Sequence, residues 1–374
     1  MQNKRIFLSP PHMSGKEVEF VQKAFESNWI APLGPYVEEF ENKIAKYIHV
    51  NSCAVLNSGT SAIHLALILS EVGEGDFVVC PSFTFSATAN PILYQKAVPV
   101  FIDSEKETWN MDPDLLLKAV LECIKKGKKP KAIIVVHLYG MPAKINAIKK
   151  IADDFEIPLI EDAAESLGST YQDKQTGSFG KFGILSFNGN KIITSSGGGA
   201  LVCNETALIE KAKFFATQSR DKAPHYEHSE IGYNYRMSNI CAAIGSAQLD
   251  LIDERVKQRR AIYDFYKNNL SDITDITFTP EPIENHSNRW LTAILLSNPE
   301  LAVKIRLDLE NHQIESRPLW KPLHLQPVFK NFPSFLNGNS ANFFQHGLCL
   351  PSGSALTQTE LSQICTLIRS HFSV

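Results

Sequence analysis

Short apolar runs alternate with longer amphipathic segments along most of the 374-residue sequence. The apolar runs are expected to be strands, and several segments between them have the apolar spacing of helices. This alternation predicts an α/β protein with a mostly parallel sheet covered on both faces, in which ligands bind at the carboxyl ends of the strands. The expected strands are residues 52–57, 77–80, 98–103, 132–137, 158–161, 184–187 and 200–203, and the helices between them include 62–69, 112–126 and 144–155.

The pattern changes after about residue 250. A helix rich in small residues is expected over 239–250, and a charged helix follows over 251–270. Further along the chain, prolines and polar turns introduce a shorter α+β pattern. We therefore expect a large α/β domain over residues 1–250 and a smaller α+β domain over residues 251–374.

Composition and charge exclude several classes of function. The net charge is −3, so no nucleic-acid partner is expected. The first residues lack the apolar core of a signal peptide, and no run approaches the ~18 apolar residues of a membrane span. The seven cysteines are scattered without a C-x-x-C pair, which predicts reduced thiols in a cytoplasmic protein and no metal site.

A lone lysine, Lys191, lies between apolar segments among turn residues. Asn188-Gly189-Asn190 precedes it, and Gly197-Gly198-Gly199 follows a short apolar triplet. An amine held among apolar residues is poorly solvated as an ammonium ion, which favours the free amine that attacks a carbonyl. The commonest resident carbonyl of this kind belongs to pyridoxal phosphate (PLP). Taken alone, the stretch fits a surface lysine on a glycine-rich hairpin better, because short motifs often match by chance.

Three clusters upstream reverse that preference. Residues 57–62 (NSGTSA) join a strand to a helix N-terminus, where free backbone N–H groups favour a phosphate; Gly59 allows close approach, and Thr60 adds a hydroxyl. Phe85 follows the next strand and could stack on a planar ring. Asp162 ends a later strand, and a carboxylate against a pyridine nitrogen would keep that nitrogen protonated. Each alone fits a capped helix, a core aromatic or a structural carboxylate, but the conjunction predicts a complete PLP site on one sheet edge.

With these motifs, the sequence resembles the sugar aminotransferases of the DegT/DnrJ/EryC1/StrS family over nearly its whole length. The resemblance implies the fold-type I aminotransferase architecture, PLP as cofactor, and a homodimer in which the neighbouring subunit completes each active site. The motifs that carry it are residues 57–62, 81–88 (PSFTFSAT), 137–140 (HLYG), 161–165 (EDAAE), 186–191 (SFNGNK), 197–199 (GGG) and 232–236 (GYNYR).

Carried over position by position, the resemblance implies that Lys191 is the Schiff-base lysine and that Asp162 holds the pyridine nitrogen. Glu165 falls where many members have glutamine, so it is expected to meet either the pyridoxal hydroxyl or the substrate. The other implied cofactor contacts are Gly59, Thr60, Ser186 and Asn188, with Phe85 on the ring face and Asn234 reaching the phosphate across the dimer.

Within the family, the sequence is most similar to enzymes that use L-glutamate to aminate the 4-keto group of a UDP-linked 4-keto-6-deoxy-N-acetylhexosamine, on the route to bacillosamine-type sugars. Guanidinium groups suit diphosphate or carboxylate, and aromatic side chains suit uracil or sugar, although each residue could equally be structural. The candidate substrate contacts are Trp29, Ile30, Arg236, Arg317, Trp320 and His324. Alternative substrates are GDP- or dTDP-linked keto sugars, or a sugar aminated at C3.

Three other functions fit the sequence less well. A related sugar dehydratase would carry histidine in place of Lys191. A nucleotide-sugar dehydrogenase or epimerase would need a G-x-G-x-x-G turn after its first strand, and Gly59 has no such partners. A non-catalytic PLP-binding regulator is disfavoured by the intact pair of Asp162 and Lys191 and by the lack of a DNA-binding segment.

Overall fold

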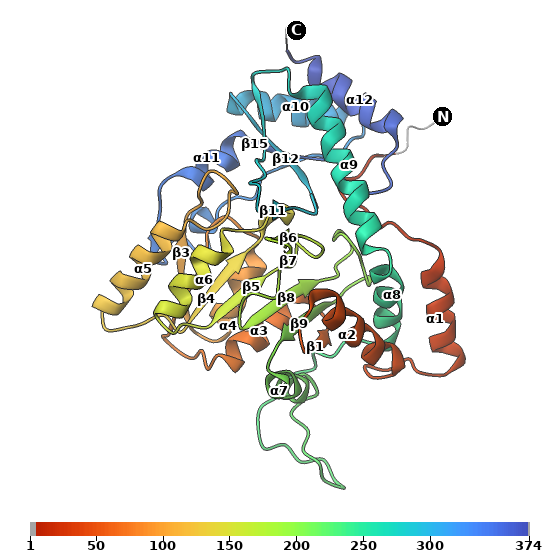
Figure 1. Ribbon diagram of the computed structural model, residues 1–374, viewed down its shortest axis with the longest axis vertical. Coiled ribbons are helices and arrows are strands. Elements are labelled where there is room, and N and C mark those ends of the chain that lie inside the picture. Colours follow the sequence, from red (N-terminus) through yellow and green to blue (C-terminus); the bar gives the residue numbers. More distant parts are fainter. Residues whose placement is uncertain (1–4, 373–374) are drawn as a thin grey trace.

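Eight strands within residues 5–372, the part of the chain that the computed structural model describes, form one sheet at the centre of the molecule (Figure 1). Neighbours from β8 to β14 pair in parallel, whereas β9 is antiparallel to both β8 and β1. The predicted mostly parallel mixed sheet is thus confirmed. The spatial order is β1 (Ser52–Leu56), β9 (Gly199–Cys203), β8 (Phe182–Ser186), β5 (Leu159–Asp162), β4 (Ala132–Val136), β2 (Phe77–Pro81), β3 (Val98–Ile102) and β14 (Ser334–Phe335).

Alternate side chains of each strand pack against two layers of helices. In β4, Ala132 and Ile134 belong to the core beneath one layer, and Ile133 and Val135 belong to the core beneath the other. Both faces are buried, which explains why the strands appear as continuous apolar runs in the sequence. The first layer contains α3 (Gly59–Leu69), α4 (Asn90–Tyr94) and α7 (Thr206–Ala216), and the second contains α5 (Pro113–Lys125) and α6 (Ile145–Asp154).

Three more helices pack together beside β1, namely α1 (Lys16–Glu26), α2 (Pro35–Ile48) and α8 (Asn239–Leu249). The small residues of α8 let α2 approach closely, because a Cβ at Gly245 would lie only 2.5 Å from Cε1 of Phe40. Between α7 and α8, residues 217–238 extend away from the body of the protein (green, at the bottom of Figure 1).

The C-terminal part of the chain builds a second, smaller α+β unit at the opposite end of the molecule (Figure 1). Its antiparallel sheet has the order β10 (Ile276–Phe278), β12 (Thr292–Leu296), β15 (Gly347–Leu350) and β13 (Arg317–Pro318). The helices of this unit are α9 (Ile252–Leu270), α10 (Pro299–Asn311), α11 (Asn339–His346) and α12 (Gln358–Arg369). A small sheet of β11 (Asn285–His286), β6 (Thr170–Tyr171) and β7 (Lys174–Gln175) joins the two parts.

The two parts exchange short segments. Strand β14 comes from the C-terminal part of the chain but pairs with β3 of the large sheet, and Ile6 near the N-terminus forms a bridge with Ile314. The domain boundary near residue 250 stays a prediction. With that boundary, β14 pairs with the sheet of the large domain, and Ile6 pairs with a residue of the small domain. Among residues 5–372, no helix is long and apolar enough to cross a membrane.

Candidate active site

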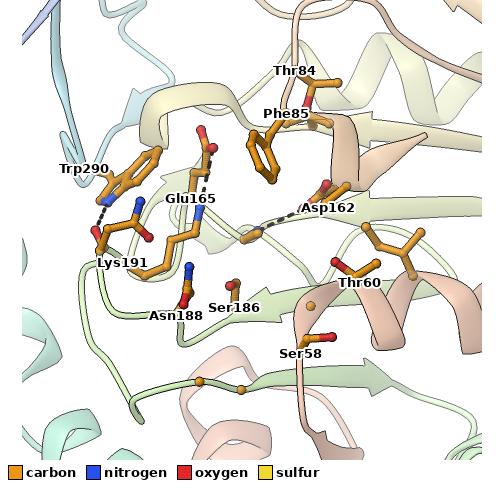
Figure 2. A pocket seen from close by; sticks show the side chains of 18 of the residues that line it. Ser58, Thr60, Thr84, Phe85, Asp162, Glu165, Ser186, Asn188, Lys191 and Trp290 are labelled. Carbon is orange, nitrogen blue, oxygen red and sulfur yellow. Dashed lines mark hydrogen bonds and ion pairs between the residues drawn. The ribbon is translucent and has the colours of Figure 1, made fainter. Parts of the chain in front are cut away.

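A cavity of about 350 Å³ lies at the carboxyl ends of β1, β5 and β8 (Figure 2). Its lining comes from the segments that follow β1, β2, β5 and β8, together with two tryptophans from the C-terminal part, Trp290 and Trp320. Strand ends far apart in sequence therefore meet here, as expected for a parallel sheet. The lining includes seven of the predicted cofactor contacts, Gly59, Thr60, Phe85, Asp162, Glu165, Ser186 and Asn188, as well as Lys191.

Lys191 lies in the connection between β8 and β9. Its backbone N–H donates to the Asn188 carbonyl at 3.0 Å, and the connection is closed at its base where the Phe187 N–H donates to the Gly198 carbonyl at 2.9 Å. The side chain points into the cavity (Figure 2), where Nζ lies 3.6 Å from Oε1 of Glu165 and 4.1 Å from the centre of the Trp290 ring. The amine is therefore placed where a cofactor carbonyl could reach it.

Asp162 ends β5 and is buried. Burial raises the pKa of its carboxyl group, while hydrogen bonds from the Thr88 hydroxyl at 2.7 Å and the Ala164 N–H at 3.3 Å oppose that effect. A buried carboxylate is stable when a cationic partner joins these donors. A protonated pyridine nitrogen is such a partner.

The N-terminus of α3 forms another wall of the cavity. Ser58 caps the helix by accepting a hydrogen bond from the Ser61 N–H at 3.1 Å, and the helix begins at Gly59, three residues earlier than predicted. Neither the Gly59 nor the Thr60 N–H has an acceptor within residues 5–372. A Cβ at Gly199 would lie 2.3 Å from the Gly59 nitrogen, so only glycine fits beside this turn. Two free N–H groups at a helix N-terminus suit a phosphate.

Phe85 and Glu165 both line the cavity near the end of the Lys191 side chain (Figure 2). Phe85 is exposed, and its ring centre is 6.4 Å from that of Trp320, so its face is free to cover a bound ring. Glu165 is buried, which raises its pKa, while nearby Lys191 acts in the opposite direction. It accepts a 2.7 Å hydrogen bond from the backbone N–H of Tyr139, a residue held at φ 55°.

Comparison with known proteins shows the family. Residues 11–369 match the sequence model of the DegT/DnrJ/EryC1/StrS aminotransferase family. The chain belongs to this family. It is 54% identical over 370 residues (98% of this chain and 95% of the relative) to a Bacillus subtilis (strain 168) protein named "Putative pyridoxal phosphate-dependent aminotransferase EpsN". It is 36% identical over 370 residues, 99% of both chains, to a "GDP-perosamine synthase" of Escherichia coli O157:H7.

The fold agrees with solved structures of the family. The "Putative sugar aminotransferase Spr1654 from Streptococcus pneumoniae, PMP-form" superposes with a TM-score of 0.91 at 27% identity, covering 98% of both chains. Its PLP form superposes with a TM-score of 0.90 at 26% identity, covering 99% of this chain and all of that one. This DegT/DnrJ/EryC1/StrS protein is thus a PLP-dependent sugar aminotransferase, and the predicted cofactor and fold class are confirmed.

The residues present fit PLP. Lys191 would supply the amine, Asp162 the carboxylate for the ring nitrogen, and the free N–H groups of Gly59 and Thr60 the phosphate site. Ser186 lies on the same wall of the cavity as these N–H groups (Figure 2). The roles of the individual side chains stay predictions, but the cavity brings together every group that the cofactor needs from one chain.

Several predicted substrate contacts lie elsewhere. Arg236 donates to Glu41 at 2.7 Å and to the Val55 carbonyl at 3.1 Å, so its guanidinium is used inside the chain and lines no wall of the cavity. Arg317 is exposed and pairs with Glu315 at 2.8 Å, also outside the cavity. Because both arginines already have partners, the cavity gives no support to their assignment as substrate contacts.

Of the remaining predicted substrate contacts, one lines the cavity and the others lie outside it. Trp320 lines the cavity, whereas His324 does not line it and pairs through Nδ1 with the Ser82 hydroxyl at 2.6 Å. Trp29 and Ile30 are exposed on the loop between α1 and α2 and do not line the cavity of their own chain. Asn234 is also exposed and outside the cavity, and its carbonyl accepts a hydrogen bond from Asn57.

Two residues of the site were not predicted. Thr88 lies within the motif of residues 81–88, and its hydroxyl holds Asp162, a role that no local pattern indicates. Trp290 had no signal at all, since it lies about a hundred positions from Lys191 in the chain and precedes an ordinary strand. Only the packing of the C-terminal unit against the large sheet brings its ring beside the lysine.

Proposed function

We propose that the protein transfers the amino group of L-glutamate to the 4-keto group of a UDP-linked 4-keto-6-deoxy-N-acetylhexosamine, giving UDP-4-amino-4,6-dideoxy-N-acetylglucosamine and 2-oxoglutarate. The observation that carries the aminotransferase reaction is the single cavity shared by Lys191, Asp162 and the N-terminus of α3. The nucleotide and sugar are inferred from the sequence resemblance. The GDP-linked product in the name of the E. coli relative favours a GDP-linked keto sugar as the second candidate.

The chain's own groups divide the work of this reaction. When bound, PLP supplies an electron sink for the carbanion that forms as the amino donor loses its α-proton. Asp162 holds the ring nitrogen in its protonated form, and the α3 N-terminus anchors the phosphate. Lys191 Nζ would take the α-proton from the amino donor as a base and deliver it to the cofactor as an acid. Phe85 and Trp320 keep water from one side of the reacting atoms.

A homodimer with shared sites belongs to the same proposal. Lys191 is the one cationic side chain that lines the cavity among residues 5–372, so a nucleotide diphosphate or a glutamate carboxylate needs cations from elsewhere. Exposed Trp29 and Ile30, together with the projecting segment 217–238, support the idea that a second copy closes the cavity (Figure 1). Asn234, at the base of that segment, would then face the neighbour's phosphate.

A panel of nucleotide-linked keto sugars tests the substrate. The PLP-loaded protein is incubated with isotope-labelled glutamate and UDP-, GDP- or dTDP-linked 4-keto-6-deoxy sugars, and mass spectrometry follows the label into an amino sugar. We expect product from the UDP-linked N-acetylated sugar, with Lys191→Ala as the inactive control. Product from the GDP-linked sugar alone would favour the second candidate. No labelled sugar from any donor would contradict nucleotide-sugar amination.

A further inference from the structure

We propose that the N-terminal segment, residues 6–12, and Arg259 hold the turn that carries Lys191 in the place that its reaction requires, and that they act through the hydroxyl of Ser9. Ser9 and Arg259 would thus be positioning residues for the reacting lysine. The inference rests on the proposed role of Lys191 as the residue that bonds to PLP, and it does not depend on which sugar is aminated.

The carbonyl of Asn190 is the point at which the turn is held. It accepts two hydrogen bonds of 2.7 Å, one from the Ser9 hydroxyl and one from the indole Nε1–H of Trp290. This carbonyl belongs to the peptide unit that joins Asn190 to Lys191, and such a unit is planar. Two donors on its oxygen therefore fix the backbone from which the Lys191 side chain extends into the cavity (Figure 2).

Arg259 connects the two donors. Its guanidinium is buried, and it donates to the Ser9 hydroxyl at 2.9 Å and to the Trp290 carbonyl at 2.5 Å. A guanidinium can donate but cannot accept, so the Ser9 oxygen must be the acceptor of this bond. The one proton of the hydroxyl is then left for the Asn190 carbonyl. The cation therefore sets the direction of the hydrogen bond that holds the lysine turn.

The burial of Arg259 has a cost that packing alone does not explain. Among residues 5–372 its guanidinium donates to two carbonyls, those of Trp290 and Ser352, and to the hydroxyl of Ser9, but to no carboxylate. A buried charge without an ionic partner costs folding free energy, which an apolar side chain of similar volume would avoid. The position of this cation behind the lysine turn is consistent with a role in the reaction.

The N-terminal segment is itself fixed to the C-terminal unit. The Leu8 carbonyl accepts a hydrogen bond from the Ser352 N–H at 2.8 Å, and the Leu8 N–H donates to Glu315 Oε2 at 3.1 Å. Ser9 is the next residue in the chain, so these backbone contacts determine where its hydroxyl lies. The segment therefore links the C-terminal unit with the turn that carries Lys191.

The same segment supports the turn a second time, beyond the lysine. The His12 carbonyl accepts a hydrogen bond from Gln248 Nε2 at 3.1 Å, and Gln248 Oε1 accepts one from the Thr194 N–H at 3.4 Å. Asn190 precedes Lys191 in the chain and Thr194 follows it. The segment therefore holds the turn on both sides of the reacting residue.

The rate at which PLP bonds to Lys191 tests the proposal. PLP is added to the cofactor-free protein, Nζ forms a C=N bond to the aldehyde carbon with release of one water molecule, and borohydride fixes this bond at set times. Peptide mass spectrometry then measures the modified fraction of Lys191. In Ser9→Ala the Asn190 carbonyl loses one donor and Arg259 loses an acceptor, so we expect bond formation to be about three- to tenfold slower than in the wild type.

The affinity for pyridoxamine phosphate separates positioning of the lysine from a general loss of structure. This form of the cofactor carries an amine in place of the aldehyde and does not bond to Lys191, so its affinity depends on the contacts to the phosphate and the ring. We expect Ser9→Ala to bind it as tightly as the wild type does. The melting temperature of the cofactor-free protein shows whether each variant is folded.

Ser178→Ala is the matched control. Ser178 is also buried, and its hydroxyl donates to the Gln175 carbonyl at 2.6 Å, but it lies outside the cavity lining. Its replacement should change neither the rate of bond formation nor the affinity for pyridoxamine phosphate. Arg259→Met should slow bond formation as Ser9→Ala does. Because both residues act through one hydroxyl, the double variant should be slower than Arg259→Met by much less than the factor found for Ser9→Ala alone.

An unchanged rate in folded Ser9→Ala would overturn the proposal. An equal loss of affinity for pyridoxamine phosphate would overturn it too, since the hydroxyl would then support the whole site. Effects that multiply in the double variant would show that Arg259 does not act through Ser9; should Arg259→Met fail to fold, Ser9→Ala decides alone. Modification of a lysine other than Lys191 in the wild type would instead contradict the proposed role of Lys191.

Discussion

At the scale of single residues, the site contains two buried carboxyl groups and one amine. Asp162 and Glu165 leave β5 three positions apart, and burial raises the pKa of both, so each charged form depends on its donors. Asp162 relies on the hydroxyl of Thr88, whereas Glu165 relies on the Tyr139 N–H and on Lys191. Two carboxylates and one ammonium group leave an excess of negative charge, which a cationic ring nitrogen would balance.

Replacement of Asp162 by asparagine tests this charge balance. The amide keeps the shape of the side chain but cannot hold the ring nitrogen protonated, so the carbanion is poorly stabilised. We expect turnover to fall about a hundredfold or more, which corresponds to a few kcal/mol of transition-state stabilisation. Steady-state kinetics of the purified variant measure the loss. Thr88→Val should give a smaller loss, because the carboxylate remains, and near-normal turnover in Asp162→Asn would assign its role to another group.

At the scale of elements, the protein positions its site through the ends of helices and strands. The α3 N-terminus offers its N–H groups, and the β8–β9 connection carries the lysine. The N-terminus of helix α1 is held by hydrogen bonds to the carboxylate of Glu17. Burial alone would raise the pKa of Glu17, but hydrogen bonds from Ser14 and from Gln248 of α8 outweigh it and lower the pKa to about 2. The loop with Trp29 and Ile30 follows directly from this helix.

The pKa of Glu17 makes the stability of the protein depend on pH. Because the folded pKa of about 2 lies below the ordinary glutamate pKa of 4.5, the stabilisation is present above about pH 4.5 and is lost as the pH falls toward 2. Glu17→Gln removes this term. We expect the wild type to lose about 0.5 kcal/mol more unfolding free energy than the variant between pH 5.5 and 4, after allowance for solvent screening. Urea unfolding at the two pH values measures the difference, and equal losses would contradict the assignment.

At the scale of the whole molecule, two exposed apolar regions support the proposal of a homodimer. The loop between α1 and α2 exposes Trp29, Ile30 and Leu33, and the segment between α7 and α8 exposes Tyr226 and Ile231. Neither region lines the cavity of its own chain. A homodimer would cover this apolar surface and bring side chains to the partner's site.

Mixing two inactive variants tests the shared site. We expect Lys191→Ala and Asn234→Ala each to be inactive, the first because it lacks the amine and the second because the neighbour's phosphate loses a donor. In a mixed dimer one site has both wild-type residues, so an equal mixture should recover roughly a quarter of wild-type activity. Native mass spectrometry verifies that subunits exchange. An inactive mixture despite exchange would show that Asn234 acts within its own chain.

Much of the fold and part of the site were determined locally by the sequence. Continuous apolar runs predict buried parallel strands because both faces of such a sheet are covered, and the structure confirms them. Gly59, Asp162 and Lys191 could be found because each lies at the end of a strand or within a few residues of it, and parallel strands place their carboxyl ends at one edge. In these cases the information lies within a few residues of the chain.

The partners of those residues were decided only by tertiary structure. Arg236 looked like a group for binding anions, but the packing of α2 places Glu41 within 2.7 Å of it. No local pattern marks Trp290, yet Arg259 and Asn190 hold its ring beside Lys191. The end of a strand determines where a residue lies in the sheet. The partner of its side chain depends on contacts between segments far apart in the chain, which no local pattern encodes.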